Sequence, residues 1–199
     1  HYLSIKEQHL FEDLYFDAYR LGAISENITL AEPVLRNTDL CTFDINAIRS
    51  SELDGSFYQN PNGLFNNEAC RILRYAGISD KISSVIIANY YCDNMSEADH
   101  ALIAQLIWYT IDGYMNRKGD FPKGSKKSYL NYKVQLLELN EEINFYKSNK
   151  SDRWWMEVPY PSNANSKYNR HHLVPCTYED YQEAMKGELP SLWWKTYQK

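Results

Sequence analysis

The sequence lacks a basic excess, a paired-cysteine motif and a long apolar run. Its 21 Lys and Arg against 26 Asp and Glu give a net charge of −5, which argues against a general nucleic-acid binder because such proteins need surplus cations to displace counterions from phosphates. The four cysteines have no C-x-x-C spacing, which argues against a zinc knuckle or a redox dithiol. No apolar run approaches the ~20 residues of a membrane helix. We therefore expect a reduced, cytoplasmic chain with neither nucleic acid nor membrane as a partner.

Aromatic residues are abundant instead. The 199 residues are 44% hydrophobic and 24% charged, which is ordinary for one globular domain. The 17 Tyr and five Trp raise the aromatic share to 15%. Large amphipathic rings belong to cores and interfaces more often than to catalytic sites.

The first part of the chain alternates helical and strand patterns. A capping box at Ser4 opens a helix that Gly22 ends, and buried strands are predicted at 40–45 and 84–90. Helices are predicted over 66–75 and from Ser96 to about Met115. Strand, helix, strand, helix predicts an α/β fold with a parallel sheet.

The pattern changes after Arg117. Alternating runs at 132–137 and 143–146 predict antiparallel strands, and Thr177 starts a last helix that ends near Gly187. We interpret residues 1–117 as an α/β domain and residues 118–199 as an aromatic-rich appendage packed on it. The pairs Trp154-Trp155 and Trp193-Trp194 are expected to pack the appendage on the sheet or fill a subunit interface, with a ligand platform as the alternative.

Two polar residues come at the end of the first strand. Asp44 and Asn46 are two positions apart, so on a strand they point to the same side, at the edge where open parallel sheets bind ligands. A single Asp at such a place is also a common helix cap, and Asn46 is a candidate for ordering the loop. The adjacent His171 and His172 point apart on a strand and are interpreted as structural or solvated, and His100 as a surface residue.

The segment T-F-D-I-N-A-I-R (42–49) resembles the S-F-D-x-D signature of the ureohydrolases, the family of arginase, agmatinase and formimidoylglutamase. N-G-L-F-N-N-E (62–68) looks like the helix start G-G-L-x-x-x-E of that family. Residues 151–161 and the tail L-W-W-K-T-Y-Q-K (192–199) resemble a bacterial formimidoylglutamase-like branch. The resemblance covers nearly the whole chain but only the C-terminal half of the usual family length.

The resemblance implies a three-layer α/β/α arginase-like fold and a binuclear manganese site that activates water to attack a guanidino or formimino carbon. Asp44 matches one metal ligand, and Asn46 stands where the family has a second Asp. Asn89 lies where the family places its substrate-binding Glu segment, which makes Asn89 the candidate substrate-binding residue. The D-A-H-x-D cluster and the further His ligand of the family are absent from this sequence.

Electrostatics limits what so few ligands can hold. Two divalent ions ~3.5 Å apart repel by roughly 19 kcal/mol at an effective dielectric of ~20, and only several carboxylates offset that. Two hypotheses stay open: the C-terminal half of a manganese-dependent hydrolase acting on a small molecule, with a missing half supplying ligands, or a non-catalytic structural or binding subunit. In both we expect a homo-oligomer or association with the missing N-terminal half, because a half-sheet leaves an edge strand exposed.

Overall fold

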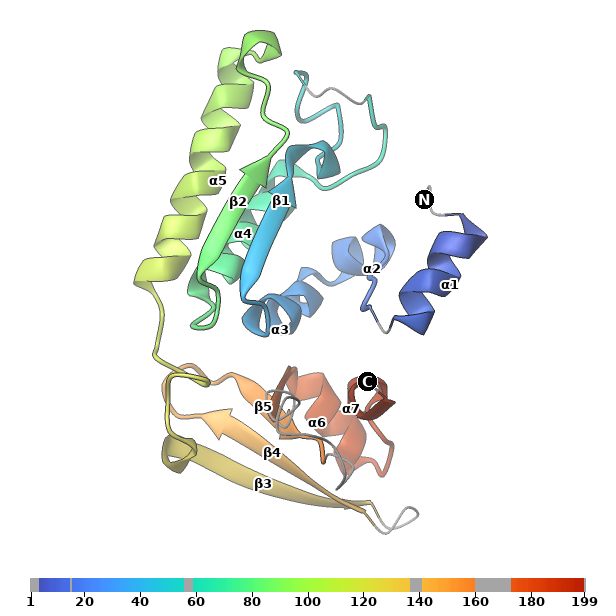
Figure 1. Cartoon of the computed structure of the whole chain (residues 1–199). Helices are drawn as coiled ribbons and strands as arrows, with labels where there is room; N and C mark the ends of the chain where they lie inside the picture. The colour runs from blue at the N-terminus through green and yellow to red at the C-terminus, as the bar shows by residue number, and fades with distance from the viewer. Residues whose placement is uncertain (1–3, 15, 56–58, 137–140, 160–172, 199) are drawn as a thin grey trace. The chain divides into compact units, whose positions relative to one another are not determined.

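The protein is described by a computed structural model over residues 4–14, 16–55, 59–136, 141–159 and 173–198. The chain divides into two compact units: residues 21–130 and 148–152, called the sheet unit, and residues 1–20, 131–147 and 153–199, called the antiparallel unit (Figure 1). The described elements are α1 (Ile5–Asp13), α2 (Leu21–Glu26), η1 (Ile28–Leu30), α3 (Ala31–Arg36), β1 (Leu40–Asp44), η2 (Ile45–Ala47), α4 (Asn66–Ile78), β2 (Ser84–Ala88), η3 (Cys92–Asn94), α5 (Glu97–Met115), η4 (Lys126–Ser128), β3 (Tyr129–Leu136), β4 (Glu141–Ser148), β5 (Trp154–Glu157), β6 (Leu173–Cys176), α6 (Tyr178–Met185) and α7 (Ser191–Gln198). No helix within the described ranges is long and apolar enough to cross a bilayer.

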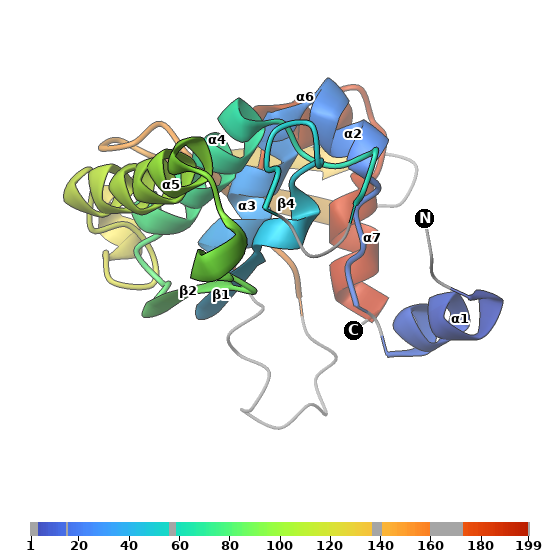
Figure 2. The ribbon, with the colours of Figure 1, turned by 90° about the horizontal axis from the view of Figure 1, so that it is seen from above.

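The sheet unit is built on a parallel pair of strands. β1 and β2 pair in register from Leu40 opposite Ser84 to Asp44 opposite Ala88, which confirms the predicted parallel sheet. α4 and α5 cover one face of this pair (Figure 2). The side chain of Phe43 points to that face and belongs to the core formed with both helices. On the other face Leu40 and Ile86 are 51% and 47% exposed. The described residues thus form two layers, and the third layer stays a prediction.

Two glycines let α4 and α5 pack closely. A Cβ added to Gly77 would collide with the carbonyl of Thr110, and one added to Gly113 would collide with the carbonyl of Arg74. An ion pair of 2.7 Å between Arg74 Nε and Asp112 Oδ2 joins the same helices. Gly77 was expected to end its helix, but it lies inside α4, where the absence of a side chain serves packing rather than capping.

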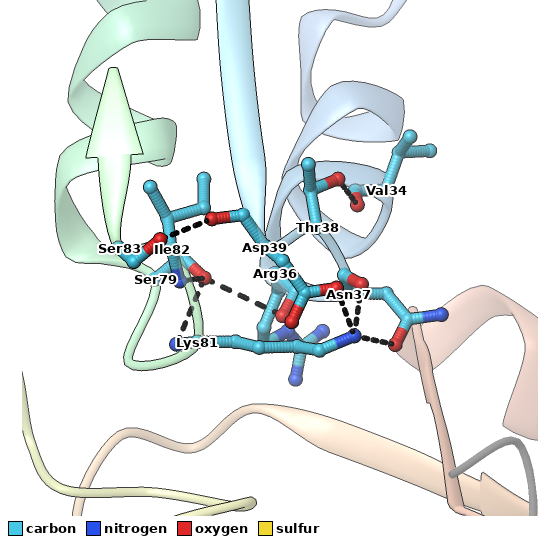
Figure 3. Close-up of polar contacts among 9 residues, drawn as sticks. All are labelled: Val34, Arg36, Asn37, Thr38, Asp39, Ser79, Lys81, Ile82 and Ser83. Carbon is cyan, nitrogen blue, oxygen red and sulfur yellow. Dashed lines mark hydrogen bonds and ion pairs between the residues drawn. The ribbon is translucent and has the colours of Figure 1, made fainter.

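Charged and hydroxyl groups tie together the amino-terminal edge of the strand pair (Figure 3). Lys81, just before β2, donates from Nζ to the carbonyl of Asn37 at 2.6 Å and forms an ion pair of 3.3 Å with Asp39. The buried Ser79 Oγ donates to the carbonyl of Arg36 and accepts from the backbone of Lys81 and Ile82. These contacts fasten the end of α3 to the segment that leads into β2.

Two buried aspartates extend this amino-terminal edge. Asp80 is 4% exposed, and its carboxylate accepts the backbone N–H groups of Gly119 at 3.1 Å and Asp120 at 2.9 Å. Asp120 is 2% exposed and accepts hydrogen bonds from Ser148 Oγ at 2.6 Å and the Tyr129 hydroxyl at 3.3 Å. Burial and, secondarily, the Asp120 carboxylate raise the pKa of Tyr129 to about 12, although the bond from the Phe121 N–H opposes this shift.

The antiparallel unit has a sheet and core of its own. Its strands run in the order β3-β4-β5-β6, with β5 antiparallel to both β4 and β6. The predicted strands at 132–137 and 143–146 correspond to β3 and β4. Trp154 and Trp193 lie in its core with Phe145 and Ala184, and Trp155 is fully buried, whereas Trp194 is 48% exposed. Trp154 and Trp193 therefore fill this unit's own core, and the expected role of the tryptophan pairs in packing the appendage on the sheet or in a subunit interface stays a prediction. The predicted domain division at residue 118 stays a prediction.

The first predicted helix is wrong in length. Its capping box is present, with Ser4 N–H donating to Glu7 Oε2 at 2.7 Å, but α1 ends at Asp13 and a new helix begins only at Leu21. Leu10 and Leu14 are each 56% exposed, so α1 lacks the tertiary packing that sustains most protein helices. Asp13 in the last turn also opposes the helix dipole.

Candidate functional site

The candidate site lies at the carboxyl-terminal edge of the strand pair. Asp44 is the last residue of β1, and its register partner Ala88 is the last residue of β2. The next residue, Asn89, therefore follows β2 at the same edge as Asp44, which is where parallel sheets present ligand-binding groups. The sequence prediction that Asp44 marks this edge is confirmed.

The three predicted site residues meet in one cluster, called the Asp44 cluster (Asp44, Asn46 and Asn89). Asp44 Oδ1 accepts hydrogen bonds from the backbone N–H and the side-chain Nδ2 of Asn46, both at 2.9 Å. Asp44 Oδ2 accepts one from Asn89 Nδ2 at 2.8 Å. Both carboxylate oxygens are thus held by N–H donors, and the amide groups present their donor ends to the negative charge.

Asn46 does not lie on the strand, contrary to the prediction. β1 ends at Asp44, and Asn46 belongs to the short helix η2. The Asp44 side chain caps η2 by accepting a hydrogen bond from the Asn46 N–H. Side chains that bind nearby backbone N–H groups in this way compete with the hydrogen bonds between strands and commonly end a strand. Asp44 is therefore a helix cap in this chain, which is the common structural role weighed for a single Asp at this position.

Asn89 has a backbone conformation that few residues adopt. Its φ is +63°, in the left-handed region, where asparagine is among the best tolerated residues other than glycine. This conformation ends β2 two residues earlier than the predicted strand and directs the amide to Asp44. The side chain thus joins the ends of β1 and β2.

The loop after β1 is fastened to the start of α5. Asp99 caps α5 together with Ser96, and its carboxylate also accepts the N–H groups of Asp54 at 3.2 Å and Gly55 at 3.1 Å. Asp99 is 3% exposed, and burial alone raises its pKa, but these hydrogen bonds outweigh burial and leave the pKa below its usual value. The sequence predicted the cap but not its bonds to the loop, because no local pattern marks contacts between residues so far apart.

Two further contacts order this edge. Asn60 Nδ2 donates to the carbonyl of Asn46 at 3.2 Å, which ties the far side of the loop to η2. Arg49 donates to the carbonyl of Gly63 and stacks on the Phe65 ring, 3.5 Å from its centroid. Neither Asn60 nor Arg49 carried a sequence signal for these roles.

The two histidine predictions have different outcomes. His100 is exposed, as predicted, and its Nδ1 contacts the hydroxyl of Tyr90, the residue after Asn89. His171 and His172 lie outside the described residues.

Comparison with known proteins gives matches among solved structures. No family model matches the chain, and no curated protein matches it in sequence. Trypanosoma cruzi formiminoglutamase, in a crystal structure with Mn²⁺, matches with a TM-score of 0.52 at 14% identity, over 58% of this chain and 42% of that one. Formimidoylglutamase from Bacillus subtilis gives the same TM-score and identity, over 58% of this chain and 39% of the other. The chain is related in fold to the ureohydrolases.

The likeness concerns the fold and part of the length. The chain spans about two fifths of the formimidoylglutamase structures that it matches. At 14% identity the match carries no information on activity. The resemblance of residues 42–49 to the ureohydrolase signature and the structural likeness therefore agree on fold.

The described residues do not fit a ureohydrolase manganese pair. Among them no group of three or more His, Cys, Asp and Glu side chains converges on one point. Asp44 supplies the single carboxylate of its cluster, and the bond from the Asn46 backbone N–H belongs to the cap of η2. A divalent ion prefers several oxygen ligands, whereas the Asp44 cluster offers one carboxylate whose two oxygens already accept hydrogen bonds.

Proposed function

We propose that this chain forms part of a ureohydrolase-fold protein with a depleted manganese site. By itself it does not hydrolyse guanidino or formimino C–N bonds, and it serves as a structural or binding subunit. The occupation of both Asp44 oxygens by N–H donors, two on Oδ1 and one on Oδ2, supports this proposal.

The donors compete with an ion for the carboxylate. The Asn46 and Asn89 side chains would each have to break their hydrogen bond to Asp44 and rotate their amide groups to offer an oxygen. The backbone N–H of Asn46 cannot rotate away without breaking the cap of η2. Asn46 and Asn89 also bring no charge to offset that of an incoming ion.

A second candidate function follows from where Asp44 lies. It ends β1 at the ligand-binding edge, within the segment that resembles the ureohydrolase signature. In this alternative Asp44 is one corner of a manganese site, and further polypeptide supplies the other ligands. The substrate would then be a small guanidino or formimino compound.

Manganese titration of the full chain tests the proposal. The electron paramagnetic resonance signal of free Mn²⁺ should stay undiminished with the wild-type chain and with Asp44→Ala. Asn46→Asp, which adds the carboxylate found in the signature, should weaken that signal through low-affinity binding.

Turnover assays with arginine, agmatine and formimidoylglutamate complete the test. We expect no turnover with or without Mn²⁺. Manganese-dependent turnover that Asp44→Ala abolishes would overturn the proposal. Turnover that arises only when a second polypeptide is added would establish the alternative.

A further inference from the structure

Helix α5 is apolar on two opposite faces. Leu102, Ile103 and Leu106 are buried in the core of the sheet unit. On the outward face Trp108 is 59% exposed and Met115 is 75% exposed. A helix that covers a globular core is expected to have a polar outer face, and large exposed apolar patches mark interaction sites.

The exposed residues form a regular row, called the α5 stripe (Ala101, Ala104, Trp108, Ile111 and Met115). Their spacings of three, four, three and four residues follow from their numbers and are the a and d spacing of a heptad. All five are exposed. Such a seam packs lengthwise against another helix, with side chains interlocking.

The stripe is small at one end and large at the other. Ala101 and Ala104 occupy its first half, and Ile111 and Met115 occupy its last half. If two copies of α5 cross antiparallel with Trp108 at the centre, Ala101 lies opposite Met115 and Ala104 lies opposite Ile111. Each large side chain then fills the space left by a small one, whereas a parallel pair would leave a gap at the alanine end.

The charges at the two ends are also complementary. Glu97 begins α5, and Lys118 lies three residues beyond its last residue; both are exposed. An antiparallel pair brings Glu97 of each copy toward Lys118 of the other. It also places the two helix dipoles in opposite directions, which is favourable. A parallel pair would place two Glu97 side chains together.

We propose that the α5 stripe is the interface of a homodimer in which two copies of this chain pack antiparallel about a two-fold axis at Trp108. Such an interface is self-complementary, since the same patch serves both partners. The inference uses no property of the Asp44 cluster, so it stands or falls independently of the proposed function.

Sedimentation of the full chain with a tryptophan pair tests the interface. Wild type is expected to sediment as a dimer and Trp108→Glu as a monomer with an unchanged circular dichroism spectrum. Trp194→Glu is the matched control, because Trp194 is also an exposed helical tryptophan, at 48%, and this variant should stay dimeric.

A charge exchange tests the antiparallel direction. Glu97→Lys and Lys118→Glu should each weaken dimerisation by about tenfold, because each introduces like-charge contacts twice in the dimer. The double variant should regain the wild-type dissociation constant. In a parallel dimer the double exchange would restore nothing.

Three results would overturn the proposal. One is a wild-type chain that is monomeric at high micromolar concentration. Another is a dimer or larger assembly whose size Trp108→Glu leaves unchanged. The third is a dimer that Trp108→Glu dissociates but whose affinity does not recover in the charge-exchanged double variant. A stripe covered by a different polypeptide would give the first or the second of these results.

Discussion

The polar groups at the two edges of the β1–β2 pair differ in how deeply they are buried. Beside the amino-terminal edge lie the residues Arg36, Ser79, Asp80, Asp120 and Ser148, all buried. At the carboxyl-terminal edge Asp44 and Asn89 are exposed, and Asp99 is the buried polar residue nearby. The edge at which a ureohydrolase would hold its metal therefore has the less buried and less charged polar groups.

This contrast separates stabilising groups from candidate functional ones. A buried carboxylate such as Asp80 must keep its donors, because their loss leaves unpaired groups away from water. The exposed carboxylate of Asp44 can exchange its amide donors for water at little cost. The polar network of the sheet unit thus stabilises the fold mainly at the edge opposite the candidate site.

Matched alanine substitutions at the two edges should change the free energy of unfolding the most, and by unequal amounts. Asp80→Ala leaves the N–H groups of Gly119 and Asp120 unpaired and should lower the free energy of unfolding by about 3 kcal/mol. Asp44→Ala should lower it by about 1 kcal/mol, because water replaces the carboxylate. Urea denaturation measures both, and equal losses would contradict the contrast.

The conformation of Asn89 should be the next most sensitive feature. Asn89→Ala loses the bond to Asp44 and places alanine at a φ of +63°, so it should cost about 1.5 kcal/mol. Asn89→Gly loses the bond but adopts this φ freely and should cost about 0.5 kcal/mol. If the alanine variant were as stable as the glycine variant in the same urea series, the left-handed conformation would not limit stability at this edge.

Alkaline pH should weaken the amino-terminal edge. The pKa of Tyr129 is about 12 in the folded chain and about 10 when unfolded. The stabilisation that the neutral Tyr129 hydroxyl gives the folded state is therefore complete below pH ~10 and is lost as the pH rises toward 12. Between about pH 8 and about pH 11 we expect a loss of about 1 kcal/mol from this group.

Comparison with Tyr129→Phe isolates that contribution. This variant should be less stable at neutral pH, since the Phe121 N–H loses its acceptor, but its stability should fall less steeply above pH 10. Urea denaturation of both proteins across this pH range gives the two slopes. Parallel slopes would show that Tyr129 does not titrate as its environment implies.

The exposed charges of the amino-terminal edge should contribute least to the free energy of unfolding. Asp39 pairs with Lys81, but its side chain is 75% exposed, so Asp39→Asn should cost about 0.3 kcal/mol and nothing in about 1 M salt. Glu142→Gln, which removes the exposed pair with Lys133, is the control in the antiparallel unit. A loss at Asp39 well above that of the control would mean that exposed charges also hold this edge.

The parallel strands and their helices could be predicted because their signals are local. The buried runs of β1 and β2 and the capping box at Ser96 mark these elements without knowledge of any contact. β6 was missed because Pro175 interrupts its pattern, yet proline is tolerated there since β6 is an edge strand. α7 was missed although it is as long as the predicted α6, because Ser191-Leu192-Trp193-Trp194 lacks the acidic residue that completes the capping box of α6 at Asp180.

The residues of the candidate site could be predicted, but their relations could not. The sequence placed Asp44 and Asn46 at one edge and Asn89 near the end of the next predicted strand. It did not show that both asparagines donate to Asp44, because side-chain bonds between strand ends depend on register and on the left-handed conformation of Asn89. The hydrogen bonds that Asp99 accepts from the loop after β1 also could not be predicted, because they join residues far apart in the sequence.

The turn Ser148–Asp152 has a consequence for how this chain can be divided. It belongs to the sheet unit although it lies between β4 and β5, and its Ser148 hydroxyl donates to the buried Asp120. The polypeptide therefore enters and leaves the antiparallel unit more than once. A gene truncated after residue 130 would therefore encode a sheet unit that lacks the Ser148 hydroxyl and leaves Asp120 without this donor.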